Sequence, residues 1–311
     1  MAKLIVMCGL QCSGKSTKAK ELANEHNATV LSSDKIREEY PTANNETVFR
    51  LLYEQMNKLL KSGVNVIVDA TNTTIKARKQ IFQNLRVKCN KICHIMNTPY
   101  EVCIERLAKR NSSDYSHKFG EDVIKRYYYA FEIPFYEEGW DIIEVENKPT
   151  IKECADFCSN VIGLAKGFNQ DNKHHTQLLN EHMNTVALLL IEQGADKNLG
   201  FAAYYHDIGK LFTQTYKESD PNAHYYNHAN VGAYKMLCNA GCYFIASDRT
   251  KDERFEAYDT LSSLEWLFYI NYHMHLFNVK TEKAEKKWRT IFGDKKYNNL
   301  VLFNEADKKR L

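Results

Sequence analysis

No stretch of this 311-residue sequence stays apolar for the roughly 20 residues that a membrane-spanning helix needs. A targeting segment is lacking as well, because the short apolar run at residues 4–7 leads directly into a glycine-containing loop and is typical of a buried strand. Internal repeats and low-complexity tracts are also missing. We therefore expect a globular, cytoplasmic protein without a membrane anchor.

Paired cysteines are lacking too. The nine cysteines are odd in number and never form a C-x-x-C pair, which argues against a disulfide framework and favours scattered, reduced thiols. The sequence also has little excess of charge of either sign. The net charge of +3 and pI of about 8.2 exclude a strongly basic nucleic-acid coat, although they are compatible with a local basic groove.

The length suffices for two domains with separate cores, and the two halves differ in composition. Residues 1–150 hold 22 Lys and Arg against 19 Asp and Glu. Residues 151–311 hold 20 against 20, but they contain 8 of the 11 histidines and are therefore richer in metal-type ligands. We predict a first domain at 1–150, a helical connector at 151–170 and a second domain at 171–311.

Residues 9–17 read GLQCSGKST and match the pattern G-x-x-x-x-G-K-[ST] of a phosphate-binding loop. The two pattern glycines let backbone N–H groups turn toward phosphate oxygens, and the following helix adds its positive N-terminal end. Lys15 is expected to reach the β- and γ-phosphates, and the Ser16 hydroxyl to bind Mg²⁺. The predicted nucleotide-binding residues of the loop are Gly9, Ser13, Gly14, Lys15, Ser16 and Thr17.

Strands alternate with helices in the first half. Apolar or β-branched runs predict strands at 4–7, 29–31, 64–68, 92–96 and 142–145, and apolar spacing predicts helices starting near residue 15, at 46–61 and at 100–110. This alternation is typical of an α/β fold with a parallel sheet flanked by helices, which binds ligands at the carboxyl ends of its strands. After residue 150 we expect helices and long loops without strands, with helices at 176–192, 201–211, 228–240 and 259–272 and a linker at residues 167–173.

Phosphoryl transfer to a hydroxyl needs a group that accepts the hydroxyl proton. Asp34, in SSDKIR, is the candidate, and Arg37 one helical turn later suits bidentate binding of a phosphate on the acceptor. The alternative is that Ser33 or Asp34 caps a helix while Arg37 is solvated.

Two further features lie near predicted element ends. Asp69 ends a hydrophobic strand, where it would bind Mg²⁺ through water or orient the acceptor; the alternative is an aspartate that caps the next turn. Arg106, Lys109 and Arg110 share one helix end at i, i+3 and i+4 spacing. They suit a cationic lid over the transferred phosphoryl group, or else form a solvated basic face.

The motifs GLQCSGKST, SSDKIR, VDATNTTIKARK and ERLAKRN, in this order over most of residues 1–145, resemble the kinase domain of the phage polynucleotide 5′-kinase family. The resemblance implies ATP or another nucleoside triphosphate as donor and a 5′-hydroxyl of RNA or DNA as acceptor. It implies Asp34 as general base, Arg37 as the contact to the acceptor phosphate, and Arg106 and Arg110 as lid arginines. Together with a composition rich in Asn and Lys and low in proline, it hints at a phage source.

Polar residues also interrupt apolar helices in the second half. His206 and Asp207 lie in AAYYHDIGK, and burying such a pair is costly unless a partner such as a metal ion compensates it. Lys210, one turn later, is a candidate for contact with a substrate phosphate. A binuclear hydrolytic site draws several His and Asp ligands from separate helices. The further candidates are His182, His228, His273 and Asp307.

The order H…HD…H…H…D over residues 174–311 resembles the HD phosphohydrolase superfamily. The resemblance implies an all-α domain with one or two divalent metals (Mn²⁺, Fe²⁺, Ni²⁺, Co²⁺ or Zn²⁺). Two roles stay open, since His275 is an alternative to His273 and His175 is a candidate substrate contact. The implied ligands are His182, His206, Asp207 and Asp307 for the first metal, with His228 and His273 completing a second site.

These features together predict a bifunctional enzyme that repairs nucleic-acid ends. We expect it to act in RNA (tRNA) repair, with a separate RNA ligase as partner. It would phosphorylate 5′-hydroxyl ends and remove 2′,3′-cyclic or 3′ (or 2′) phosphates. One alternative is a nucleoside or nucleotide kinase joined to a nucleotide phosphohydrolase. Another is a nucleotide-gated, RNA-binding regulator. The sequence favours RNA over DNA only by this context, and it does not define the metal or the oligomeric state.

Overall fold

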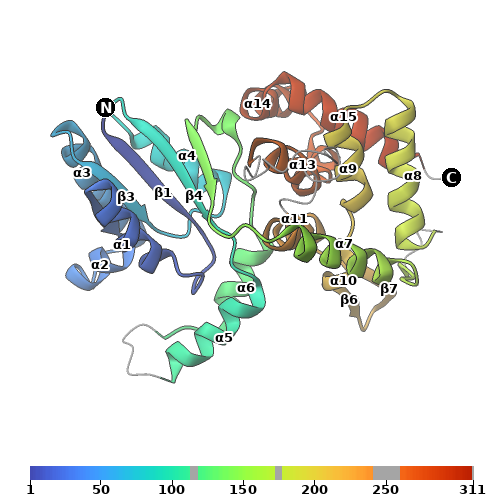
Figure 1. Ribbon diagram of the computed structural model, residues 1–311, viewed down its shortest axis with the longest axis horizontal. Helices are drawn as coiled ribbons and strands as arrows, with labels where there is room; N and C mark the ends of the chain where they lie inside the picture. The colour runs from blue at the N-terminus through green and yellow to red at the C-terminus, as the bar shows by residue number, and fades with distance from the viewer. Residues whose placement is uncertain (113–117, 172–176, 241–259, 310–311) are drawn as a thin grey trace. The chain divides into compact units, whose positions relative to one another are not determined.

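The computed structural model describes residues 1–112, 118–171, 177–240 and 260–309, with side chains in the last range described from residue 264. The chain forms two compact units (Figure 1). The first contains Met1–Tyr127 and Glu138–Asn147, and the second contains Tyr128–Glu137 and Lys148–Leu311. Residues 128–137, an internal segment of the first half, therefore belong to the second unit. The domain boundaries at 150 and 170 remain a prediction.

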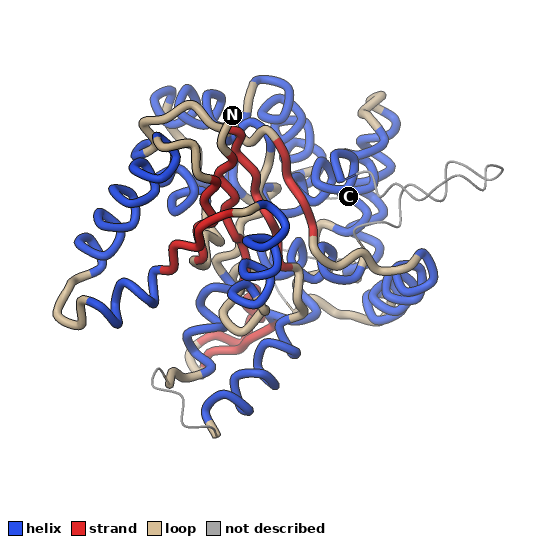
Figure 2. Tube along the Cα trace, turned by 60° about the vertical axis from the view of Figure 1, so that its left-hand side comes forward, coloured by secondary structure: helices blue, strands red, loops and turns tan. Residues whose placement is uncertain are grey.

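A five-stranded sheet forms the centre of the first unit. Its order is β2-β3-β1-β4-β5, and every neighbouring pair is parallel. The central strand reads LIVMC over residues 4–8 and is almost fully buried, because helices pack beside the sheet (Figure 2). The strands are β1 (Lys3–Gly9), β2 (Ala28–Ser32), β3 (Asn65–Asp69), β4 (Asn90–Met96) and β5 (Ile142–Val145).

The predicted parallel α/β sheet flanked by helices is confirmed for the first unit, and each predicted strand is present. Three helices outside the predicted ranges, α2, α4 and α6, follow β2, β3 and α5. The helices are α1 (Lys15–His26), α2 (Ser33–Glu39), α3 (Asn45–Lys61), α4 (Ile75–Asn84), α5 (Tyr100–Asn111) and α6 (Glu121–Tyr129).

The second unit is mainly helical, as expected, with one exception. Two short strands, β6 (Gln214–Lys217) and β7 (Asp220–Tyr225), form an antiparallel hairpin where only helices and loops were predicted. Within the described residues, no helix combines the length and apolar character needed to cross a membrane. The helices are α7 (Ile151–Ala165), α8 (Leu179–Glu192), α9 (Lys197–Tyr205), α10 (Lys210–Thr213), α11 (His228–Asn239), α13 (Thr260–Tyr272), α14 (Glu282–Phe292) and α15 (Asp294–Lys308).

The single helix predicted at residues 201–211 is wrong, because a turn at residues 206–209 separates α9 from α10. Tertiary packing accounts for the break. Gly209 lies so close to the start of α11 that a Cβ atom there would be 1.9 Å from the carbonyl oxygen of His228 and 2.8 Å from the nitrogen of Gly232. The turn, not a continuous helix, therefore carries His206 and Asp207.

Candidate functional site

The loop between β1 and α1 has the backbone geometry that contact with phosphate requires. Gly14 has a φ of 97°, in the left-handed region that favours glycine. At Gly9 an added Cβ atom would lie 2.9 Å from the Cβ of Met96 on the neighbouring strand, so a larger residue would displace β4 or the loop. Thr98 after β4, which the sequence did not single out, donates its hydroxyl to the carbonyl oxygen of Ser13 at 2.8 Å. Residues of two elements thus hold the loop.

Lys15 and Asp69 lie at the ends of neighbouring elements, where α1 begins and β3 ends. Both are buried, and the Lys15 Nζ donates to the carbonyl oxygen of Leu10. Burial lowers the pKa of Lys15, and the negative charge of Asp69 opposes that shift. Asp69 does not cap the next helix, because Thr74 caps α4. Ser16 lines the same cleft as Lys15 and Asp69, so an oxygen-ligated cation beside bound phosphates can be held there.

Asp34 and Arg37 lie on α2, directly after β2. Ser32 is the N-cap, since its hydroxyl accepts a hydrogen bond from the Asp34 nitrogen at 3.3 Å, and the Asp34 carboxylate is therefore not used for capping. Arg37 donates to Asp34 Oδ1 at 3.0 Å and to Asn45 Oδ1 at 3.1 Å. Because the Asp34–Arg37 pair is exposed, it contributes less than about 1 kcal/mol and a bound substrate can replace it.

The three cations on α5 face the same cleft. Arg106 donates to the carbonyl oxygen of Cys12 at 3.3 Å and so reaches the phosphate loop directly. The Arg110 guanidinium lies 5.3 Å from the centre of the Phe119 ring, while Lys109 completes the set. This helix face is therefore not merely a solvated basic surface.

One cleft of 2330 Å³ in the first unit brings these residues together. Eleven Lys and Arg but only six Asp and Glu line it, an excess of five positive charges, compared with +3 for the whole chain. Positive charge is thus concentrated where phosphates would bind. The lining cations are Lys15, Lys18, Arg37, Arg50, Lys76, Arg86, Arg106, Lys109, Arg110, Lys118 and Arg126.

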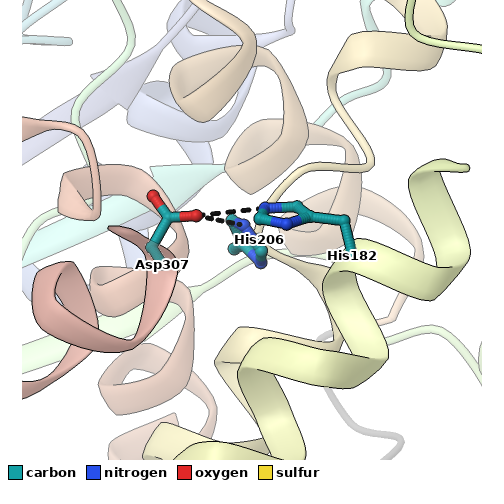
Figure 3. A group of neighbouring side chains, drawn as sticks. All are labelled: His182, His206 and Asp307. Atoms are coloured by element: carbon teal, nitrogen blue, oxygen red, sulfur yellow. Dashed lines mark ion pairs between the residues drawn. The ribbon is translucent and has the colours of Figure 1, made fainter. Parts of the chain in front are cut away.

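In the second unit, residues from several helices converge on a cluster of imidazoles and carboxylates. His182 comes from α8, His206 follows α9, and Asp307 comes from α15 (Figure 3). Asp307 Oδ1 lies 3.0 Å from His182 Nε2 and 3.6 Å from His206 Nε2. A second group of potential ligands joins His206 to Asp207 and His273, and in each group the ligand atoms lie within 4.8 Å of one another.

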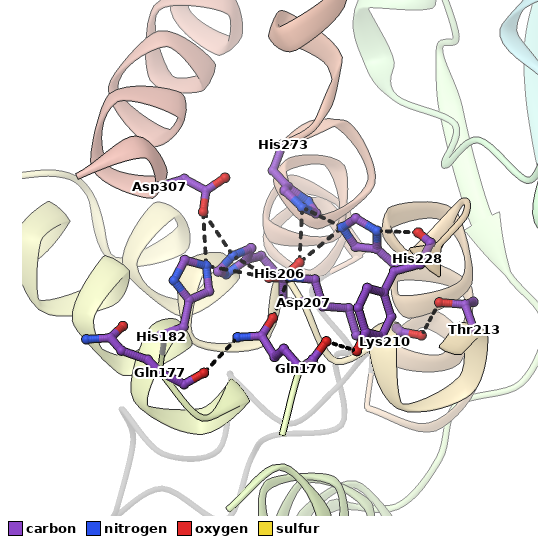
Figure 4. Close-up of polar contacts among 12 residues, drawn as sticks. Gln170, Gln177, His182, His206, Asp207, Lys210, Thr213, His228, His273 and Asp307 are labelled. Carbon is purple, nitrogen blue, oxygen red and sulfur yellow. Dashed lines mark hydrogen bonds and ion pairs between the residues drawn. The ribbon is translucent and has the colours of Figure 1, made fainter. Parts of the chain in front are cut away.

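Asp207, a member of the second group, also faces the first, because its two carboxylate oxygens point toward different histidines (Figure 4). Its Oδ2 is 3.5 Å from His182 Nε2 and 3.4 Å from His206 Nε2. Its Oδ1 is 3.0 Å from His228 Nε2 and 3.5 Å from His273 Nε2. A buried carboxylate that faces imidazoles through both oxygens suits a bridge between two metal ions.

Three of these histidines are oriented by their other ring nitrogen. The Nδ1 atoms of His206, His228 and His273 contact the backbone carbonyl oxygen three residues earlier, at 2.6, 2.8 and 2.7 Å. In the neutral imidazoles these contacts favour the tautomer that protonates Nδ1 and leaves Nε2, which faces Asp207, available to a cation. The buried Nε2 of His206 has no hydrogen-bond partner among the described residues. A cation between imidazole and carboxylate would satisfy both, so this donor set fits a transition metal.

Charges in the cluster shift the pKa values of its members. Burial lowers the pKa of His206, but the carboxylates of Asp207 and Asp307 outweigh it and raise that pKa to about 10. Burial raises the pKa of Asp207, but Lys210 and His206 hold it well below its usual value. Burial lowers the pKa of His273 to about 4, so this imidazole is neutral at pH 7. Without a metal, His206 and Lys210 compensate the buried negative charge.

Lys210 is buried beside Asp207, and its Nζ lies 2.6 Å from Asp207 Oδ2 and 2.8 Å from Gln170 Oε1. Gln170 is fully buried, but it lies in the predicted connector and the sequence offered no signal for it. His275 packs edge-on against Trp288, with ring centres 4.0 Å apart, and belongs to neither ligand group. The candidate His175 lies outside the described residues.

Each comparison with known proteins covers only part of the chain. A family model described as an AAA domain matches residues 4–134, which include the phosphate loop with its strand and helix. The match covers less than half of the chain. The search of curated proteins found no match.

Several solved structures are similar to part of the chain. A chain of the Pnkp1/Rnl/Hen1 RNA repair complex is 22% identical with a TM-score of 0.37, and the match covers 40% of this chain and 42% of that one. A putative kinase from Chloroflexus aurantiacus is 20% identical with a TM-score of 0.38, covering 47% and 84%. Shikimate kinase from Acinetobacter baumannii is 17% identical with a TM-score of 0.33, covering 54% and 97%.

Proposed function

We propose that the protein is a bifunctional enzyme that repairs the two ends of a broken RNA. The first unit would phosphorylate the 5′-hydroxyl end, and the second would remove a 2′,3′-cyclic or a 3′ (or 2′) phosphate. The observation that carries the proposal is the presence in one chain of a cationic cleft around a phosphate loop and of a buried His/Asp cluster. Ribonucleases leave these two kinds of end, and a separate RNA ligase requires both to be corrected.

In the first unit, the side chains divide the work of phosphoryl transfer. Lys15 and the loop N–H groups would bind the β- and γ-phosphates of ATP. Asp34 would accept the proton of the 5′-hydroxyl while the hydroxyl oxygen bonds to the γ-phosphorus of ATP. ADP would leave as the bond between the γ-phosphorus and the β–γ bridging oxygen breaks. Mg²⁺, when bound near Ser16 and Asp69, would neutralise phosphate charge.

Recognition of the acceptor would depend on the cations of the cleft. Arg37 would leave its weak pair with Asp34 to bind the acceptor phosphate, and so free the carboxylate to act as a base. Arg106 and Arg110 would stabilise charge on the transferred phosphoryl group.

A polynucleotide acceptor fits this cleft better than a small molecule does. Pockets for small ligands measure about 300–1,000 Å³, whereas this cleft measures 2330 Å³. Aromatic and basic side chains both line it, including Phe49, Arg50 and Tyr53 on α3. Such a surface stacks bases and attracts the phosphate backbone.

In the second unit, one or two divalent metals would be held by the His/Asp cluster. When bound, such a metal supplies a Lewis acid and an acidified water for hydrolysis. The carbonyl contacts of Nδ1 would keep His206, His228 and His273 in the metal-binding tautomer. Lys210 would supply a cation for the substrate phosphate. The choice of substrate rests on the neighbouring kinase, because the cluster by itself defines only phosphate chemistry.

The test uses one RNA with a 5′-hydroxyl and a 2′,3′-cyclic phosphate, incubated with ATP, Mg²⁺ and Mn²⁺. We expect both ends to react. Asp34→Asn should abolish only 5′ phosphorylation, and Asp207→Asn only the reaction at the 3′ end. Faster phosphorylation of free nucleosides than of the RNA would instead favour a nucleoside kinase, and inertness of both ends with every divalent metal would refute the proposal.

A further inference from the structure

The hairpin β6–β7 begins and ends at the His/Asp cluster. Asp207 and Lys210 precede β6 closely in the chain, and His228 follows β7. The Tyr225 hydroxyl donates to the carbonyl oxygen of Gln170 at 2.6 Å, while the Gln170 side chain accepts from Lys210. Chain continuity and these contacts therefore place the hairpin at the rim of the cluster.

An isolated two-stranded hairpin is only marginally stable in water, but this one is anchored to Asp171, which lies in the predicted linker at residues 167–173. The nitrogen of Ala223 donates to the carbonyl oxygen of Asp171 at 2.8 Å, and the Tyr216 hydroxyl donates to Asp171 Oδ2 at 2.8 Å. Ala223 is buried, whereas the neighbouring His224 is only partly so. Ala223 therefore anchors β7 while His224 beside it stays accessible.

Two tyrosine rings stand out from this hairpin, with Tyr216 56% exposed and Tyr226 51% exposed. The strand register shifts between Thr215 and Lys217, so Tyr216 lies at an irregularity that re-aims its side chain. The His224 ring is stacked with that of Tyr226, with centres 5.5 Å apart and planes at 5°. The Lys217 Nζ lies 5.4 Å from the centre of the Tyr226 ring.

We propose that the surface formed by Tyr216, Lys217, His224 and Tyr226 binds the single-stranded nucleotides next to the 3′ end on which the His/Asp cluster acts. Base faces would stack on the tyrosines, as on other single-strand platforms, and Lys217 would face the phosphate backbone. The inference rests on the proposed function of the cluster.

Three observations favour RNA over a protein partner at this surface. The exposed large apolar side chains of the two strands and their flanks are aromatic, without an exposed Leu, Ile or Met among residues 212–226. The anchored Tyr216 hydroxyl and the stacked His224 hold rings in place, which reduces the entropy lost on binding. The carboxylate of Asp220 is engaged by His224 at 3.1 Å, which lessens its repulsion of phosphates.

The test compares two substrates, a single-stranded RNA hexamer ending in a 2′,3′-cyclic phosphate and a nucleoside 2′,3′-cyclic monophosphate. Tyr216→Ala and Tyr226→Ala should each raise KM for the hexamer by about fivefold or more. The same variants should leave kcat/KM for the mononucleotide unchanged. Tyr226→Phe should keep the wild-type KM, because the ring and not the hydroxyl does the stacking. Leu188→Ala, at an exposed apolar residue of α8, is the matched control.

An unchanged hexamer KM in a variant that combines Tyr216→Ala and Tyr226→Ala would overturn the inference, and so would an equal loss on both substrates. If the wild type hydrolyses neither substrate, the proposed function of the cluster fails. Photocrosslinking of a 4-thiouridine-containing RNA, mapped by mass spectrometry, still decides the binding surface in that case. Crosslinks at residues 216–226 would support it, and crosslinks exclusively elsewhere would overturn it.

Discussion

Replacing Gly209 by alanine should separate the two elements that carry the His/Asp cluster. The residue lies between the turn that holds His206 and Asp207 and the first turn of α11, which begins with His228. An added Cβ atom would lie 1.9 Å from the carbonyl oxygen of His228, and such contacts are essentially never shorter than 3.0 Å. The two backbones must therefore move apart by at least about 1.1 Å, since neither neighbour is the flexible end of a side chain.

The expected cost has two parts. Overpacking of this kind destabilises proteins by about 1–3 kcal/mol. The movement also lengthens the 3.0 Å contact between His228 Nε2 and Asp207 Oδ1. A misplacement of about 1 Å at a catalytic group can lower activity by about 100-fold. We therefore expect a clear loss of 3′-end hydrolysis and weaker binding of Mn²⁺, while 5′ phosphorylation by the first unit persists.

The assay combines urea unfolding, Mn²⁺ binding by calorimetry and hydrolysis of the cyclic phosphate. Gly163→Ala is the control, because an added Cβ atom on that exposed residue of α7 meets nothing within 4 Å. The control should be neutral or stabilising by about 0.5–1 kcal/mol. If Gly209→Ala matches this control in stability, metal binding and hydrolysis, then the close approach of the two backbones does not position the cluster and the reasoning is refuted.

Three further predictions concern other parts of the molecule. Arg78→Met should destabilise the first unit by about 3–5 kcal/mol in urea unfolding, because it leaves the buried Glu138 unpaired after the loss of contacts of 2.6 and 2.7 Å. Arg78→Met with Glu138→Leu should restore much of that loss, and simple additivity of the two changes would contradict this account. The hydrogen bond with His94 lowers the pKa of Glu144 in the folded protein below its unfolded value of 4.5. The ionised Glu144 therefore stabilises the fold fully above pH 4.5, and this stabilisation is lost as the pH falls through the folded pKa. Acid unfolding of Glu144→Gln should accordingly be less steep than that of the wild type below pH 4.5, and identical curves would exclude the effect. Removal of metal by a chelator should lower the Tm, and Mn²⁺ at 100 times its Kd should restore about 2.7 kcal/mol; a similar gain in Asp207→Asn would mean that the metal binds elsewhere.

The parts of the fold that the sequence predicts are those with local signals. Strand β1 is recognisable because a central parallel strand is buried on both faces and reads as a continuous apolar run from Leu4 to Cys8. The hairpin β6–β7 has no such signal, because it contains Pro221 and polar residues without alternation. It forms through tertiary contacts, such as that of Ala223 with Asp171. The assignment of residues 128–137 to the second unit is also tertiary, since Ile133 donates to the side chain of Asn271.

The candidate sites divide in the same way. Charged and imidazole side chains can be selected from the sequence by type and order, and the structure brings the six selected residues of the cluster together. Residues that act through neutral hydrogen bonds leave no such pattern. Gln170 holds Lys210 from the connector, and Thr98 holds the phosphate loop from the end of β4. The positive charge that lines the cleft could not be predicted from the sequence either, because Arg50, Lys76 and Arg86 are far apart along the chain.

The central claim, two independent phosphate sites that act on one broken RNA, is tested most directly by complementation. An RNA with a 5′-hydroxyl and a 2′,3′-cyclic phosphate, labelled at both ends, would be incubated with ATP, Mg²⁺ and Mn²⁺ and with an equimolar mixture of Asp34→Asn and Asp207→Asn. Each variant alone should alter one end only, and the mixture should convert both ends of the RNA. If each substitution abolished both reactions, or if neither abolished its own, the assignment of one chemistry to each unit would be contradicted.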